Sequence, residues 1–179
     1  MQVDACILDP MNYLLVAALG ACTGLRTMTP IAVLCWFAWE QTLHLSGWRS
    51  FAASLVSVVI FTAAAAGELV GDKLPSTPSR TAPLGLGARV VFGAFVAVIL
   101  AQPLLLNPFV AAMLGAVGAV VGAYVGWFAR TRTVAALHVP DLPVALTEDA
   151  ITLALSITFL HLAAVHGALF GGNEGLFVR

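Results

Sequence analysis

Five long apolar stretches dominate this sequence, and each is long enough to cross a lipid bilayer as a helix. They cover residues 13–39, 50–71, 84–106, 109–129 and 144–170. About 30 Å of hydrocarbon requires roughly 17–25 helical residues, and lipid offers no hydrogen bonds to an open backbone. The sequence therefore predicts an all-α integral membrane protein, a single polytopic domain over residues 1–179 with about five transmembrane helices.

Charged side chains are too few to cover the outside of a soluble domain of this length. The chain has eight basic and nine acidic residues, or 9% of its length, and 60% of its residues are hydrophobic. Soluble domains have about 25% charged residues. The formal net charge of −1 also offers no basic excess for a phosphate backbone. Soluble enzymes and nucleic-acid-binding proteins are therefore excluded, and the expected partner is membrane lipid.

Basic residues near the ends of the stretches predict the orientation in the membrane. With five crossings, the loop with Lys73 and Arg80 and the loop with Arg130 and Arg132 lie on one side. The positive-inside rule places that side and the N-terminus in the cytoplasm, with the C-terminus outside. Alternatively, the first stretch is a re-entrant hairpin, which leaves four full crossings and reverses the sidedness of the later loops.

Arg26 lies about halfway through the first apolar stretch. A charge at the bilayer centre costs at least about 2.5–3.5 kcal/mol on insertion scales, so such a residue is a functional candidate. Pro30 removes a backbone donor, so we expect the first helix to be broken or kinked between Arg26 and Pro30. The hydroxyls of Thr27 and Thr29 would then be free to meet a solute or a partner helix.

The alternative role for Arg26 is purely structural. A buried ion pair with an acidic residue of another stretch would fix the register of the helices without any chemistry. The candidate partners are Glu68, Glu148 and Asp149.

Other charged residues cluster where the stretches end. The candidates for a solute or ion path there are Glu68, Asp72, Lys73, Arg80, Arg89, Glu148 and Asp149. An interfacial belt of snorkelling side chains is the simpler explanation, but it suits short acidic side chains less well. Thr152 and Ser156 follow Glu148 at a spacing of four, which places a polar stripe on one helix face. This stripe lines a cavity or makes interhelical hydrogen bonds.

Small residues at helical spacing predict close helix packing. The motifs are Gly20 and Gly24 in the first stretch, and Gly118, Gly122 and Gly126 in the fourth. Such small-xxx-small patterns let helices approach within one chain or between two. Because so small a bundle has little interior, we expect a homo-oligomer, with a dimer favoured.

Three segments resemble a known family. They are GACTGLRTMTP (residues 20–30), GELVGDKLPSTPSRTAP (67–83) and PDLPVALTED (140–149). They are similar to the signature segments of a bacterial family of small multi-pass membrane proteins catalogued as domain of unknown function 4126. The resemblance implies a polytopic protein of the bacterial inner membrane, and it implies no activity.

These features favour a transporter or channel for a small polar or anionic solute. The alternatives are a non-catalytic packing or assembly protein and, with less support, a membrane enzyme that handles lipid phosphate. An enzyme is the less favoured class because the chain has no DxxD-type metal motif, no HExxH and no glycine-rich phosphate loop. We expect no cofactor and no metal.

Overall fold

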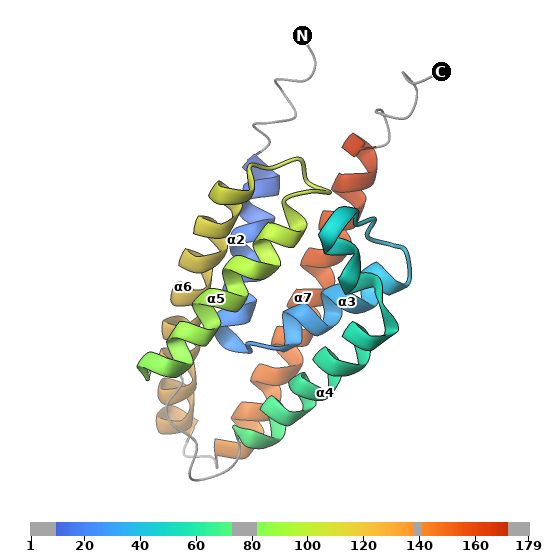
Figure 1. Ribbon diagram of the computed structural model, residues 1–179. Coiled ribbons are helices and arrows are strands. Elements are labelled where there is room, and N and C mark those ends of the chain that lie inside the picture. The colour runs from blue at the N-terminus through green and yellow to red at the C-terminus, as the bar shows by residue number, and fades with distance from the viewer. Residues whose placement is uncertain (1–9, 73–81, 138–140, 172–179) are drawn as a thin grey trace, which may run out of the picture.

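A computed structural model of the chain describes residues 10–72, 82–137 and 141–171, and the regular structure of these residues is entirely helical. The elements are α2 (Pro10–Leu25), α3 (Thr29–Trp39), the 3-10 helix η1 (Gly47–Ala53), α4 (Leu55–Gly71), α5 (Pro83–Leu100), α6 (Pro108–Leu137) and α7 (Asp141–Gly171) (Figure 1). The predicted all-α membrane bundle is confirmed. By length and composition α5, α6 and α7 can each cross a membrane, and η1 with α4 forms a bent fourth candidate.

Proline and serine mark several helix starts. Pro83 and Pro108 are the first residues of α5 and α6, where a backbone N–H has no intrahelical partner to lose. Ser54 precedes α4, and its side chain accepts a hydrogen bond from the backbone N–H of Ser57. The extended backbone of Ser54 separates α4 from η1, and the two are bent by 63°. The stretch expected at 50–71 is therefore a bent pair of helices.

The first apolar stretch is broken near Arg26–Pro30, as predicted. Helix α2 ends at Leu25 and α3 begins at Thr29. Pro30 has no N–H to donate to the carbonyl of Arg26, so the helical ladder is interrupted there. The 16 residues of α2 rise about 24 Å, which is less than the roughly 30 Å of a bilayer core. The stretch thus forms two short apolar helices.

The start of α2 and the segment that follows α3 both contact residues 101–107. Asn12 Nδ2 donates to the carbonyl of Leu104 at 3.2 Å, and the backbone N–H of Ser46 donates to Gln102 Oε1 at 3.1 Å. Helix α2 runs inward, the chain reverses at the break, and α3 runs back (Figure 1). This is the geometry of the re-entrant alternative. We call the end that holds residues 101–107 the turn end.

The opposite end, which we call the loop end, is formed by the ends of α4 and α6 and the starts of α5 and α7 (Figure 1). Gly167, near the end of α7, packs beside Pro103 at the turn end. The described chain therefore starts and finishes at the turn end. This differs from the expected placement of the N- and C-termini on opposite sides, because α3 returns instead of completing a crossing.

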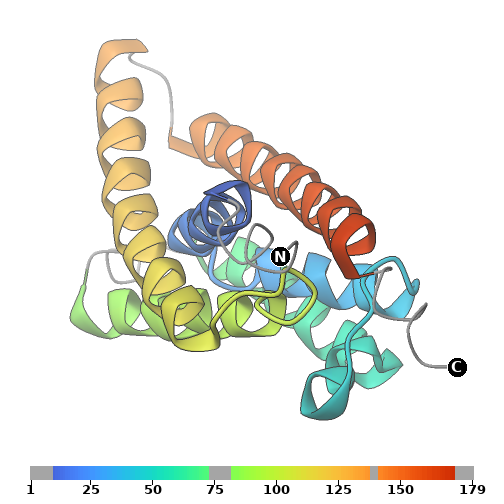
Figure 2. The same ribbon diagram turned by 90° about the horizontal axis from the view of Figure 1, so that it is seen from above.

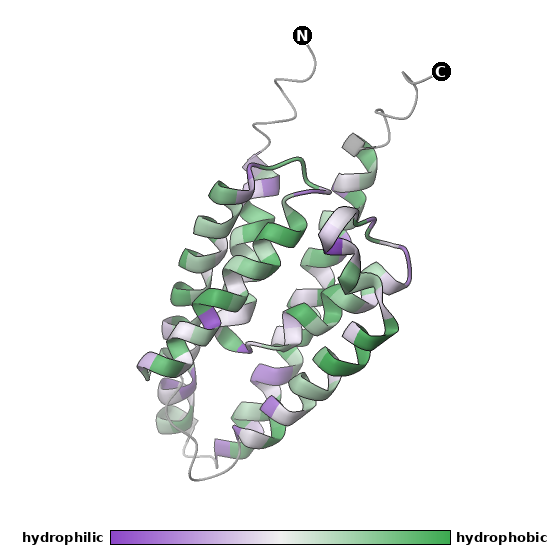
Figure 3. Ribbon diagram, in the orientation of Figure 1, coloured by the Kyte–Doolittle hydropathy of each residue, from purple (hydrophilic) through white to green (hydrophobic). Residues whose placement is uncertain are grey.

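Apolar side chains fill the interior and also cover the outside. The core includes Leu19, Leu34, Leu100 and Leu160, which are fully buried. Large apolar side chains on the outer faces remain exposed, for example Phe109 at 73%. Figure 3 shows hydrophobic residues along most of the helices and several hydrophilic ones near the break and toward the loop end. A bundle with this outer surface is suited to lipid and not to water.

Candidate functional site

Helix α2 packs against α6 through residues that lack large side chains. A Cβ atom added to Gly20 or Gly24 of α2, or to Gly118 or Gly122 of α6, would overlap backbone atoms of the opposing helix. The facing pairs are Gly20 with Gly115, Gly24 with Ala119 and Gly122, Gly118 with Ala17, and Gly122 with Ala21. We call these contacts the glycine seam. They are contacts within one chain, so these glycines no longer argue for a second copy.

Two glycines of this packing were not selected from the sequence. A Cβ on Gly93 of α5 would meet Gly115, Ala119 and the hydroxyl of Thr23. Gly115 lies three residues before Gly118 on the same helix, and this spacing was a usable signal. Gly93 is followed four residues later by Ala97, a small-xxx-small spacing that was also a usable signal. Gly126 lies further along α6, where it lines a groove facing α7.

Arg26 lies at the break between α2 and α3 and is fully buried. Its guanidinium forms ion pairs with Asp72, which follows α4, and with Asp149 of α7. Its Nε finds no hydrogen-bond acceptor among the described residues. One buried cation therefore joins three separate parts of the chain, and one of its donors remains unused.

Glu68 stabilises the break itself. Its two carboxylate oxygens accept hydrogen bonds from the backbone N–H groups of Thr27 and Met28, at 2.8 and 2.7 Å. These N–H groups precede α3, where the helix dipole also favours a negative charge. Arg89 of α5 is 5% exposed, and one of its nitrogens lies 4.0 Å from Glu68 Oε1. Glu68 therefore connects the break with both α4 and α5.

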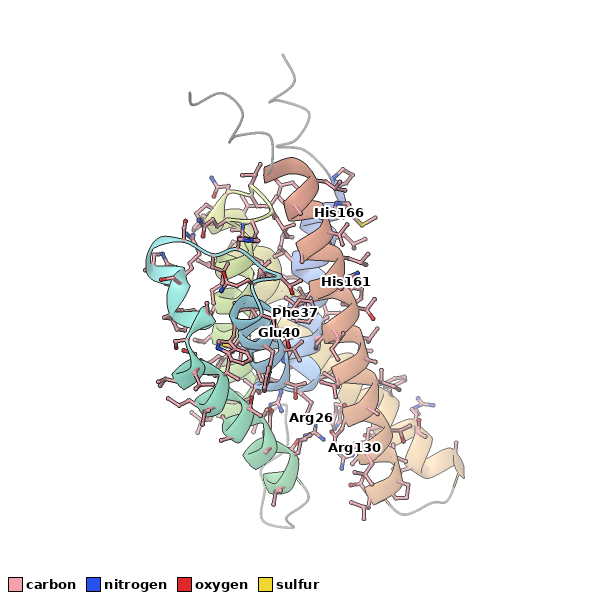
Figure 4. All side chains as sticks on the ribbon, turned by 90° about the vertical axis from the view of Figure 1, so that its right-hand side faces the viewer. Arg26, Phe37, Glu40, Arg130, His161 and His166 are labelled. Atoms are coloured by element: carbon pink, nitrogen blue, oxygen red, sulfur yellow. The ribbon has the colours of Figure 1, made fainter. Side chains whose placement is uncertain are left out.

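A second group of charges lies nearer the loop end. Arg130 Nε donates to Asp141 Oδ1 at 2.8 Å, and Arg130 NH1 lies 3.8 Å from Glu148 Oε2. Figure 4 shows Arg26 and Arg130 in the same part of the molecule, beside the first half of α7. His161 and His166 lie on the other half of that helix (Figure 4).

The polar stripe of α7 faces protein and not lipid. Thr152 and Ser156 are fully buried, and their hydroxyls donate to the carbonyls of Glu148 and Thr152 of the same helix, at 2.8 and 2.7 Å. Thr27 and Thr29 are also buried. The two hydroxyls of the stripe are thus satisfied within α7, which suits helix packing better than a strongly polar path.

The structure therefore brings together most of the charged residues selected from the sequence. They surround the break in two adjoining groups, which we call the ionic cluster: Arg26, Glu68, Asp72, Arg89 and Asp149 in one, and Arg130, Asp141 and Glu148 in the other. Lys73 and Arg80 lie outside the described residues.

The chemistry of this cluster is that of ion pairing. Carboxylates and arginines held close together in a low-dielectric interior interact strongly with each other and with any ion that enters. Within residues 10–72, 82–137 and 141–171, no three His, Cys, Asp or Glu side chains come close enough to hold a metal ion.

Comparison with known proteins defines the family. No curated protein and no solved structure matches the chain. A match to a family sequence model covers residues 13–178, which is nearly the whole chain and includes every residue of the ionic cluster. The chain belongs to the family described as domain of unknown function (DUF4126).

Proposed function

We propose that this membrane protein is a small transporter whose solute path passes the break between α2 and α3. The observation that carries the proposal is Arg26, a fully buried cation at a helix break that retains a donor without an acceptor among the described residues. Broken helices with ionisable groups at their ends are how many transporters build a site within the membrane.

The balance of charge favours a proton-coupled solute over a free anion. The described cluster holds five carboxylates, of Glu68, Asp72, Asp141, Glu148 and Asp149, against the three arginines Arg26, Arg89 and Arg130. An anion at Arg26 would have to displace Asp72 or Asp149. Protonation of one carboxylate releases the same arginine, so proton binding and solute binding would be linked.

We further propose that the loop end faces the cytoplasm of a bacterial inner membrane. The loops at this end contain or adjoin Lys73, Arg80, Arg130 and Arg132, and the positive-inside rule assigns such loops to the cytoplasm. The described chain then begins and ends on the outer side.

The test is flux in proteoliposomes under an imposed pH gradient. Entrapped pH-sensitive dye reports proton movement while polar metabolites and small ions are added one class at a time. We expect Asp149→Asn to reduce solute-dependent proton flux at least about tenfold, because it removes one partner of Arg26. Glu40→Gln, at an exposed carboxylate that belongs to neither group of the ionic cluster, is the matched control and should retain flux. The absence of any solute-dependent flux in the wild type would contradict the proposal.

A second candidate is a non-catalytic packing protein, and a specific observation favours it. Arg26 is paired with two carboxylates, and the hydroxyls of Thr152 and Ser156 donate to their own helix. Ion pairs and hydrogen bonds that are all made within the protein are sufficient to fix the register of its helices. This candidate predicts no flux for any solute, together with loss of folding when Arg26 is replaced. The lipid-phosphate enzyme gains no comparable support, since Lys73 and Arg80 lie outside the described residues.

A further inference from the structure

The carboxylate of Glu68 occupies a site at the helix break that suits carboxylates in general. Each of its two oxygens accepts a hydrogen bond from a different backbone N–H group, those of Thr27 and Met28, at 2.8 and 2.7 Å. A guanidinium nitrogen of Arg89 lies 4.0 Å from one of these oxygens. Backbone N–H groups at the start of a helix also bind free carboxylates. We call these three residues, Thr27, Met28 and Arg89, the carboxylate cradle.

A further donor next to the cradle is left unused. Arg26 directly precedes Thr27 in the chain, and its side chain is fully buried. Its Nε has no acceptor among the described residues. A buried donor without an acceptor is costly. Glu68 leaves this donor unused because its carboxylate is tethered to α4, whereas a free carboxylate can approach it.

Few contacts hold Glu68 in place through its own helix. Helix α4 packs mainly against α3 and η1, and its buried residues are Ser57 and Val58, both near its start. Viewed from above, α4 passes under α3, and its last turn lies beneath the break (Figure 2). There it is joined to the break through Glu68 and Asp72. The side chain of Glu68 is 13% exposed, so it can leave the cradle without disturbing the apolar core.

Charge decides when Glu68 leaves. The charged groups around it are Arg89 of α5, Arg26 at the break, Asp72 after α4 and Asp149 of α7, with Arg130 and Glu148 in the adjoining group. Carboxylates already outnumber arginines in the ionic cluster, so a second free negative charge is unfavourable there. A proton on Glu68 removes one negative charge and weakens its bonds to the N–H groups. One carboxylate can therefore enter for each proton that Glu68 takes from water.

We propose that the cradle is the binding site of a small monocarboxylate, and that Glu68 occupies it as an internal substitute until it is protonated. The carboxylate of the solute then accepts from the N–H groups of Thr27 and Met28 and from the unused donor of Arg26. This inference rests on the function proposed above and names its solute class. Binding is measured without transport, so the two proposals can fail separately.

The test is calorimetric titration of the purified full chain with formate, a small carboxylate. At neutral pH we expect Glu68→Gln to bind formate at least about tenfold more tightly than the wild type, because the competing charge is gone. Glu148→Gln is the matched control: it removes a carboxylate that lies near Arg130, and it leaves Glu68 on the two N–H groups. Equal gains in both variants would show that net charge, and not the cradle, binds formate, and would overturn the proposal.

Hydrogen exchange locates the bound formate. In Glu68→Gln, formate should slow exchange of the Thr27 and Met28 amides at least about fivefold, and neutral formamide should not. Unchanged exchange of these amides in formate would overturn the proposal.

The wild type tests the role of Glu68 as a substitute even if the variant does not fold. It should bind formate at about pH 5 more tightly than at about pH 7.5, because formate stays ionised while Glu68 gains protons. Binding by the wild type at neither pH would leave Glu68 as a helix cap only and overturn the proposal. A wild type that binds formate but moves no solute in proteoliposomes would contradict the transporter and support this site.

Discussion

Helix α2 is held in the bundle by two different kinds of contact. Along its length it meets α6 through the glycine seam, where backbones touch and no charge takes part. At its end Arg26 is held by a hydrogen-bonded ion pair with Asp72 and by an ion pair with Asp149. The glycine seam depends only on the absence of side-chain atoms, so an added Cβ atom overlaps the opposing backbone. The ionic contact depends on specific partners from distant elements, so removal of one charge leaves the others without a partner.

The largest effect is expected where one charge of the ionic cluster is removed. Arg26→Ala leaves the half-buried Asp72 and Asp149 without their cation, which costs about 3–5 kcal/mol of unfolding free energy. Thermal and denaturant unfolding in detergent measures the loss. Replacing all three charges, with Arg26→Met, Asp72→Asn and Asp149→Asn together, should recover much of it. A single variant as stable as the wild type would show that the ion pairs do not hold α2.

The glycine seam can be broken by adding atoms. Gly122→Val places methyl groups against the backbone at Ala21, and such overpacking costs about 1–3 kcal/mol. Gly87→Val is the matched control, because an added Cβ on that glycine meets nothing within 4 Å. The same unfolding measurement compares the two variants. Equal effects would mean that helix propensity, and not close backbone approach, dominates at both sites.

A smaller loss is expected where a carboxylate caps the break. Glu68→Gln removes the charge but keeps one acceptor for the N–H groups of Thr27 and Met28, at a cost of about 0.5–2 kcal/mol. Hydrogen exchange of these two amides should accelerate, while the amides of the glycine seam stay protected. Unchanged exchange at Thr27 and Met28 would show that the carboxylate does not hold the break.

The smallest effect is expected at the edge of the ionic cluster. The side chain of Asp141 is 60% exposed, and water screens its pair with Arg130. Asp141→Asn should therefore cost at most about 1 kcal/mol, and high salt should reduce the difference further. A loss as large as that of Arg26→Ala would place this pair in a much less hydrated environment than its exposure indicates.

Much of the helical organisation was predictable from local patterns. The apolar lengths predicted the membrane helices, and Pro30 predicted the break that the structure has between Leu25 and Thr29. The direction of the chain after the break was not predictable. A proline interrupts the ladder in the same way whether the next helix continues or returns, and only packing of α3 against α4 and α7 selects the return.

The candidate site was likewise predictable from the sequence only in part. Arg26 was conspicuous because charge in an apolar run is costly, and Asp149 was among its expected partners. Its other partner, Asp72, was selected only as part of the charged group at the ends of the stretches. Gly93 carried a local packing signal with Ala97, but no local pattern identified Gly115 as the residue it meets. Pairing between residues far apart in sequence depends on where the chain reverses.

Local patterns along the chain place this protein in a membrane as helices, indicate that its first helix is broken and identify the charged residues that need partners. These properties follow from the local cost of placing charges and unpaired backbone in hydrocarbon. The three-dimensional arrangement adds three properties: the broken stretch is a hairpin (Figure 1), Arg26 is shared by Asp72 and Asp149, and a groove lies between α6 and α7. Each of these depends on how distant helices pack, and no single segment encodes it.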